Sequence, residues 1–369
     1  MTTSRRSLIA GSTISLLGGS SILPAQTPDT NVHENIRRSA EQASLSMRID
    51  ARELGPRRIR AWQHKFRSIL ARQLGNYKPP GSWQVSRENV TRLDDHTRHQ
   101  LVLSAKGHPN LPVYLLVPRE QSLRPGPGVV AIHGHGDFGY ETVAGRDDLE
   151  GVSEAIEKAN YDYGRQLVRE GYVVCIPCLV PFGRRVDRKA HAGQDPCAVT
   201  FVRMQLLGRV LMGENLRDCL WAFELLRQHP QVDADRIGCV GLSYGGRMTM
   251  LTAAMQPRIR AAVVSGALNV MQERVSVRYS CGGQVIPGLL KFGDVQEIGS
   301  LIAPRPCVWE TGSEDGLIIE PWASEAMDRI KQVYHVLGAA DQIQRDVFDG
   351  GHRWNGVVGM PILKTALAV

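Results

Sequence analysis

A serine between two glycines is the residue of this 369-residue chain best placed to carry out chemistry. Residues 241–246 read Gly-Leu-Ser-Tyr-Gly-Gly, after a strand-like run at 236–240 and before a helix-like run at 247–255. A Gly-x-Ser-x-Gly turn bends a strand sharply into a helix and exposes the serine hydroxyl above the sheet. The pentapeptide alone is common in turns, but its flanks predict that Ser243 is a nucleophile.

A nucleophilic serine needs a general base to take its proton. His352 ends the loop sequence Asp349-Gly-Gly-His, which follows a predicted strand at 344–348. The preceding histidine, His335, falls on a predicted helix at 320–337, where a helix-face residue is the simpler interpretation. We predict His352 as the base, with a solvated loop histidine as the alternative.

The base in turn needs a carboxylate that orients its ring. Asp315 comes shortly after a predicted strand at 306–311, on the side of the sheet where the serine turn opens. We predict Asp315 as this acid. Glu314 is the neighbouring alternative, and Glu310, inside the strand, fits the role less well.

Two backbone N–H groups must also converge on the developing oxyanion. The residue after the nucleophile, Tyr244, supplies one. A predicted strand at 128–132 continues into His133-Gly-His-Gly136, and we assign the second donor to the N–H of His135. The paired histidines could suggest a metal, but the sequence shows no further ligand clustered beside them at zinc spacing.

These motifs resemble the α/β-hydrolases of the dienelactone hydrolase and acetyl xylan esterase-like group. The resemblance runs from about Trp62 to His352. Its motifs, in chain order, are His133-Gly-His-Gly136, Glu170-Gly-Tyr-Val-Val174, the run 232–238 before the serine turn, Ile302-Ala-Pro-Arg-Pro306, Gly312-x-x-Asp315 and Gly350-Gly-His352.

The resemblance implies hydrolysis of carboxylic esters by Ser243, His352 and Asp315, without a metal or an organic cofactor. Dienelactone hydrolases proper use a cysteine nucleophile, so the serine favours the esterase branch. Cys178 stands where members commonly carry an aspartate, and hydrogen bonding there is expected to differ.

The N-terminus has the layout of an export signal. Residues 1–26 contain adjacent arginines, Arg5 and Arg6, then a short apolar stretch and a small residue before a plausible cleavage site. The arginine pair suggests the twin-arginine route. No run of about 20 apolar residues follows, so we expect a periplasmic or secreted protein without stable membrane insertion.

Seven cysteines make an odd count, so at least one thiol is unpaired. Cys175, Cys239 and Cys307 fall in predicted strands, where small buried thiols are the usual finding. Cys175-x-x-Cys178 could indicate redox chemistry or a metal, but it lies along a strand and no second pair follows at zinc spacing. We expect structural thiols.

The formal charge of +7 is concentrated in a basic segment. Residues 52–72 carry seven arginines and lysines, and the same segment places apolar residues at helical spacing before Gly75. The apolar stripe predicts a helix docked on the core with its basic face in water. Nucleic-acid or membrane binding is the alternative, which no aromatic-interleaved basic motif supports.

The chain as a whole predicts an α/β fold. We expect an export signal over 1–26, an N-terminal helical extension over 27–80 and a catalytic α/β-hydrolase domain over 81–369. Strand candidates at 100–104 and 113–117 suit opening antiparallel strands. From Gly128 onward, strands alternate with helices, which is typical of a mostly parallel central sheet with helices on both faces.

Two stretches are long enough to roof the site, at 181–213 and 269–300. From them we select Phe182, Arg185 and Tyr279 as candidate substrate contacts, although the basic residues of the first stretch also fit an exposed loop. We expect a short-acyl ester of a carbohydrate or related small molecule. A peptidase or amidase on the same triad, and a catalytically silent carbohydrate-binding relative, are the alternatives.

Overall fold

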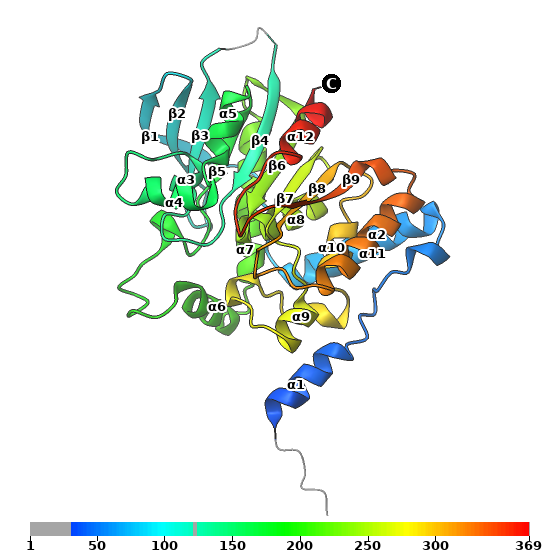
Figure 1. The fold of residues 1–369 in the computed structure, drawn as a ribbon. Coiled ribbons are helices and arrows are strands. Elements are labelled where there is room, and N and C mark those ends of the chain that lie inside the picture. The colour runs from blue at the N-terminus through cyan, green and yellow to red at the C-terminus, as the bar shows by residue number, and fades with distance from the viewer. Residues whose placement is uncertain (1–30, 121–123, 369) are drawn as a thin grey trace, which may run out of the picture.

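The computed structural model describes residues 31–120 and 124–368, which build one nine-stranded mixed sheet with helices on both faces (Figure 1). The strands lie in the order β1-β2-β3-β5-β4-β6-β7-β8-β9. Their bounds are β1 Gln84–Arg92, β2 His96–Ser104, β3 Leu111–Pro118, β4 Gly126–Ile132, β5 Val173–Pro177, β6 Val232–Leu242, β7 Ala262–Ser265, β8 Cys307–Gly312 and β9 Ile343–Phe348.

Strand direction divides the sheet into two parts. β1, β2, β3 and β5 pair antiparallel in that order, whereas β5, β4, β6, β7, β8 and β9 pair parallel. The predicted α/β fold, with opening antiparallel strands and a mostly parallel remainder, is confirmed. Parallel strands all end at one edge, so the residues that follow β4, β6 and β8 meet there.

The longer helices are α1 Val32–Glu41, α2 Pro56–Leu74, α4 Val152–Ala159, α5 Tyr163–Arg169, α6 Pro196–Leu206, α7 Leu211–Arg227, α8 Tyr244–Met255, α11 Trp322–Val336 and α12 Gly359–Leu367. Shorter helical turns are η1 Ala51–Glu53, α3 Tyr140–Val143, η2 Gly183–Arg185, α9 Met271–Ser276, η3 Gly282–Gln284, η4 Leu289–Lys291, α10 Val295–Ser300 and η5 Ala340–Gln342.

Alternating side chains of the central strands feed two hydrophobic cores. In β4, Val130 and Ile132 face the core beneath α7 and α8, whereas Val129 and Ala131 face the core beneath α5 and α12. This alternation is the two-residue period of a strand buried on both faces. The sheet is therefore held rigidly from both sides, and its edge loops are positioned by buried strands.

The predicted basic helix is present as α2. Its buried residues include Ile59, Phe66 and Leu70, and the chain leaves the helix at Gly75 with a positive φ of 70°. The export signal predicted for residues 1–26 lies outside the described residues. Among the helices that are described, none is both long and apolar enough to cross a bilayer.

Candidate active site

Ser243 occupies the sharp turn between β6 and α8. Its φ of 64° is unusual for a residue with a side chain, and such strain persists only where the surroundings enforce it. Glycines make the close packing possible: a Cβ on Gly245 would lie 1.9 Å from the carbonyl oxygen of Ile132, and one on Gly246 would lie 2.2 Å from that of Ser265. The backbone therefore presents the serine at the edge of the sheet.

His352 and Asp315 form a hydrogen-bonded pair beside this edge. The distance from His352 Nδ1 to Asp315 Oδ2 is 2.7 Å, and the other carboxylate oxygen accepts from the backbone N–H of Leu317 at 2.9 Å. Because the buried carboxylate accepts the Nδ1 proton, Nε2 of the neutral ring is left as the basic nitrogen. That Nε2 atom is buried and has no hydrogen-bond partner among the described residues.

Gly266 leaves room for the imidazole of His352 because it has no side chain. A Cβ on this residue would lie 2.8 Å from Cε1 of His352, and its φ of 58° also favours glycine. Sequence reasoning missed this residue. The signal in the sequence was a single glycine directly after the run 261–265, most of which forms β7.

The alternatives to Asp315 and His352 lie elsewhere. Glu314 and His335 are exposed. Glu310 is fully buried in β8 and accepts a hydrogen bond from the N–H of Gly356 at 2.9 Å, in the loop that follows His352. Burial raises the pKa of Glu310 to about 7. Glu310 therefore lies beneath the loop that follows His352 and stabilises its backbone through this hydrogen bond.

His133 fixes the loop predicted to carry the second oxyanion donor. Its Nε2 accepts from the N–H of Leu179 at 2.9 Å, which leaves Nδ1 to donate to the carbonyl of Gly134 at 2.8 Å. Burial lowers its pKa to about 4, so the ring is neutral near pH 7. With both nitrogens engaged, His133 serves to shape the loop.

Gly134 brings this loop against the serine turn. A Cβ on it would lie 3.0 Å from Cβ of Ser243 and 2.5 Å from the hydroxyl oxygen of Tyr161, which accepts the Gly134 N–H at 2.8 Å. Within the described chain, the N–H groups of His135 and Tyr244 make no hydrogen bond. Both predicted donors are thus free to bind an oxyanion. Tyr161 was missed, since nothing in its local sequence marks the contact.

A cavity of about 210 Å³ opens beside Ser243. Tyr279 stands at its rim and is 85% exposed, as befits a residue available to a ligand. Arg278 brings positive charge to the same wall, whereas the charge of Arg274 is partly offset by Glu273 at 3.5 Å. Their guanidinium groups donate to the carbonyls of Gly316 and Leu317, respectively. The full lining is His135, Ser243, Gly266, Asn269, Arg274, Arg278, Tyr279, Ser280, Cys281, Gln284 and Leu317.

Phe182 and Arg185, the other two candidate substrate contacts, lie outside this lining. Phe182 is buried against the rings of His133 and His135, and it borders a separate cavity of about 160 Å³. Arg185 forms a buried ion pair with Asp218 and donates to the carbonyl of Cys178 at 2.9 Å. The structure therefore engages both in supporting the loop that follows β5.

All seven cysteines are free thiols. Cys175 and Cys178 are buried in and just after β5, and burial raises the pKa of both. Cys281 borders the cavity, and its pKa is shifted in the opposite direction. The neighbouring thiol of Cys197 lowers the pKa of Cys281, and the ring of His135 lowers it further.

Comparison with known proteins gives a relative that spans most of the chain. "Putative hydrolase YtaP" of Bacillus subtilis is 30% identical over 288 residues, which cover 74% of this chain and 89% of that protein. The profile of the Prolyl oligopeptidase family matches residues 207–273, which contain the serine turn.

Solved structures share the architecture at low sequence identity. A putative acetyl xylan esterase from Bacteroides fragilis superposes with a TM-score of 0.73 at 16% identity, covering 85% of this chain and 81% of its own. A glucuronoyl esterase from Solibacter usitatus gives a TM-score of 0.58 at 15% identity, covering 83% and 91%. At these identities the likeness concerns the fold.

Proposed function

The chain belongs to the α/β-hydrolase family, and we propose that it cleaves carboxylic esters through Ser243, His352 and Asp315. The observation that carries the proposal is the 2.7 Å contact between His352 and Asp315 beside the strained serine turn. It leaves one buried, unpartnered ring nitrogen, the atom that would accept the serine proton in the proposed reaction.

In the proposed reaction the hydroxyl of Ser243 attacks the ester carbonyl while Nε2 of His352 takes its proton. Asp315 holds the ring and stabilises the imidazolium that forms. The N–H groups of Tyr244 and His135 bind the oxyanion, and each such donor typically lowers the barrier by about 3 kcal/mol. His352 then protonates the leaving alcohol, and water releases the acid from the acyl-enzyme by the same steps.

For the substrate we propose short-acyl esters, above all acetyl esters, of carbohydrates or related small molecules. A cavity of about 210 Å³ suits a small acyl group. The guanidinium groups of Arg274 and Arg278 on its wall favour sugars or phenols that also carry a carboxylate. Two structural neighbours are named as an acetyl xylan esterase and a glucuronoyl esterase, and these names describe enzymes that act on carbohydrate esters.

Peptide bond cleavage by the same triad is the second candidate. The observation that favours it is the match of residues 207–273 to the Prolyl oligopeptidase family. A peptidase should release product from a matched peptide or anilide at a readily measurable rate, whereas the proposed esterase should leave it essentially uncleaved.

The test is labelling with a fluorophosphonate probe followed by hydrolysis of p-nitrophenyl esters from acetyl to octanoyl. Wild type should be labelled and should turn over the acetyl ester fastest, and Ser243→Ala should lose both properties. Ser280→Ala is the matched control, because this serine lines the same cavity and has no role in the proposed chemistry. Labelling of Ser243→Ala at the wild-type rate would refute the assignment of the nucleophile.

We also propose export by the twin-arginine route. The support is the layout of residues 1–26, with the pair Arg5 and Arg6 ahead of a short apolar stretch. Replacing both arginines by lysine should retain the protein in the cytoplasm of a bacterial host, as fractionation and immunoblotting would show. Unchanged export would exclude this route.

A further inference from the structure

Three side chains with metal-binding atoms meet at the wall of the candidate active site. His135 follows β4, Cys197 lies in the first turn of α6, and Cys281 caps the N-terminus of η3. One ligand atom from each residue lies within 4.8 Å of the other two. Segments far apart in the sequence therefore bring one imidazole and two thiols together.

These atoms are available to a ligand. The Nε2 atom of His135 is buried and has no hydrogen-bond partner in the described part of the chain. Both cysteines are free thiols. The sulfur of Cys281 accepts from the N–H of Gly283 at 3.3 Å, and it lies close enough to the thiol of Cys197 and the ring of His135 for both to lower its pKa. Buried polar atoms are nearly always satisfied, so an orphaned imidazole nitrogen beside two thiols indicates a missing partner.

We propose that His135, Cys197 and Cys281 form a binding site for Zn²⁺ or another soft cation. Two thiolates and one imidazole are a zinc donor set that leaves the fourth tetrahedral position open. Tetrahedral zinc holds such donors about 3.3–3.8 Å apart, so small side-chain rotations would close the set. The two thiol protons leave to solvent as the metal binds.

The neighbouring His133 does not compete for the metal. Its Nε2 accepts from the N–H of Leu179, and its Nδ1 donates to the carbonyl of Gly134. The sequence pair His133-x-His135 is therefore split: one ring shapes the loop and the other faces the two thiols. This division explains how the motif can contribute a single ligand.

Metal binding at this place would act on the hydrolytic site. His135 and Cys281 line the 210 Å³ cavity together with Ser243. A cation with its open-position water narrows that cavity, since one water takes up about 30 Å³. It also ties the oxyanion loop to α6 and η3. We expect reversible inhibition by Zn²⁺; this consequence rests on the proposed ester hydrolysis, whereas the metal site itself does not.

The test is titration of the reduced, untagged, full-length chain with Co²⁺ and Zn²⁺. Wild type should bind one equivalent and show the near-ultraviolet charge-transfer band of cobalt–thiolate bonds. Cys197→Ser and Cys281→Ser should each lose at least about tenfold in affinity and most of the band. Cys307→Ala, which removes a buried thiol of β8, is the matched control and should bind as wild type does.

Activity supplies a separate readout. Zn²⁺ should slow p-nitrophenyl acetate hydrolysis by wild type and Cys307→Ala, and Cys197→Ser should resist it relative to its own metal-free rate. Equal metal affinity in all variants would overturn the proposal, as would absence of the cobalt band in reduced wild type. If one cysteine variant does not fold by circular dichroism, the other carries the test. A protein that binds cobalt but cleaves no ester would refute only the proposed function.

Discussion

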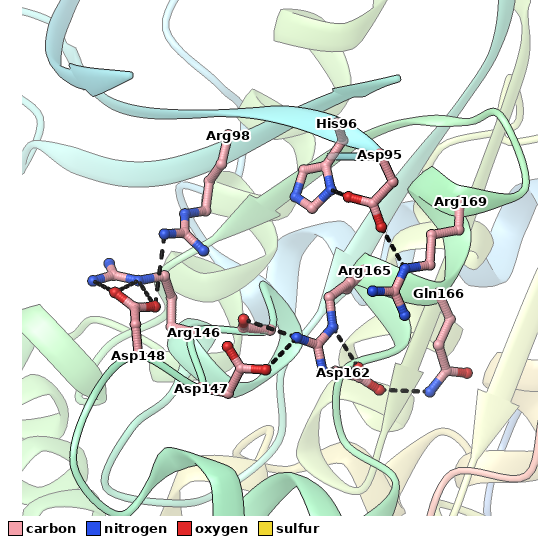
Figure 2. A network of polar contacts seen from close by, with 11 residues as sticks. Asp95, His96, Arg98, Arg146, Asp147, Asp148, Asp162, Arg165, Gln166 and Arg169 are labelled. Atoms are coloured by element: carbon pink, nitrogen blue, oxygen red, sulfur yellow. Dashed lines mark hydrogen bonds and ion pairs between the residues drawn. The ribbon is translucent and has the colours of Figure 1, made fainter. Parts of the chain in front are cut away.

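Two polar regions of this molecule differ in whether their side chains have partners. The first, shown in Figure 2, is a charged network on β2, α5 and the loop after α3. Arg165 donates to Asp162 at 2.7 Å and to Asp147 at 2.5 Å. Each aspartate and arginine of the network lies in an ion pair, and the one buried side-chain atom of the network without a hydrogen-bond partner in the described residues is Nε2 of His96. Its members are Asp95, His96, Arg98, Arg146, Asp147, Asp148, Asp162, Arg165, Gln166 and Arg169.

The second region is the cavity beside Ser243. In its lining and beside it, Nε2 of His135 and Nε2 of His352 are buried without a hydrogen-bond partner among the described residues. Leaving such atoms unpaired costs stability. The charged network pairs almost all of its own polar groups, whereas the cavity leaves polar atoms unpaired, as the proposed hydrolysis and the proposed metal site both require. Substitutions in the two regions should therefore separate activity from stability.

The largest expected effect is that of His352→Ala. Removing the base should lower kcat for p-nitrophenyl acetate by a factor on the order of 10⁴ to 10⁶. The free energy of unfolding should fall by about 1–2 kcal/mol, because the ring is 29% exposed but its loss leaves the buried Asp315 carboxylate with only the N–H of Leu317 as a partner. Stopped assays and urea denaturation measure the two quantities. His335→Ala, which removes an exposed histidine, is the control and should keep wild-type activity. Loss of activity in this variant would mean that the effect is not specific to His352.

The next effect concerns Glu310, which supports the histidine loop from inside the sheet. Burial raises the pKa of Glu310 to about 7, above its unfolded value near 4.5. The folded protein therefore binds the extra proton between these pH values, and stability falls as pH rises from about 4.5 to 7. The glutamine of Glu310→Gln cannot titrate. The fall in the free energy of unfolding over this pH window should therefore be smaller in the variant than in wild type, and the difference between the two falls should be up to about 3 kcal/mol.

Urea denaturation of both proteins at pH 5 and pH 7.5 measures this difference. The comparison uses the change with pH in each protein, so a constant cost of the amide cancels. Parallel changes in the two proteins would mean that Glu310 is ionised throughout, and that the loop of Gly356 is held by a carboxylate.

A smaller effect is expected from Arg165→Ala in the charged network. The guanidinium is 18% exposed and bridges Asp162 and Asp147, so its loss leaves the largely buried carboxylate of Asp162 without its cationic partner and with only the amide of Gln166 at 2.7 Å. We expect a cost of about 2 kcal/mol in the free energy of unfolding. The kcat should stay within twofold of wild type. A large fall in kcat with unchanged stability would reverse the roles of the two regions.

Much of the fold was predictable because each level of the sequence agreed. The serine turn, the strands at 306–311 and 344–348, and the loop ending in His352 occur in the chain order that one parallel sheet edge requires. The structure brings His352 and Asp315 into contact. That both follow strands ending at the same edge of the sheet as the serine turn could be anticipated from topology alone, since the carboxyl ends of parallel strands meet.

What could not be predicted depends on contacts between distant segments. Nothing near Cys197 or Cys281 in the sequence indicates that both face His135. Likewise, the sequence around Arg185 indicates an exposed basic residue, whereas the structure pairs it with the buried carboxylate of Asp218. Spacing along the chain reports ligands only when they share an element, so a site assembled from a strand end, a helix start and a short turn leaves no local pattern.

The smallest effect should come from Arg169→Ala, at the exposed end of the charged network. Its contact with Asp95 is short, 2.5 Å, but the two side chains are 54% and 33% exposed. Such pairs contribute about 0.2–1 kcal/mol and weaken with salt. Urea denaturation should show a small loss in the free energy of unfolding at low salt, and this loss should disappear in 1 M NaCl. If the cost instead matched that of Arg165→Ala and was not additive with it, the network would act as one unit, and the exposed pair would share in the stability of the buried one.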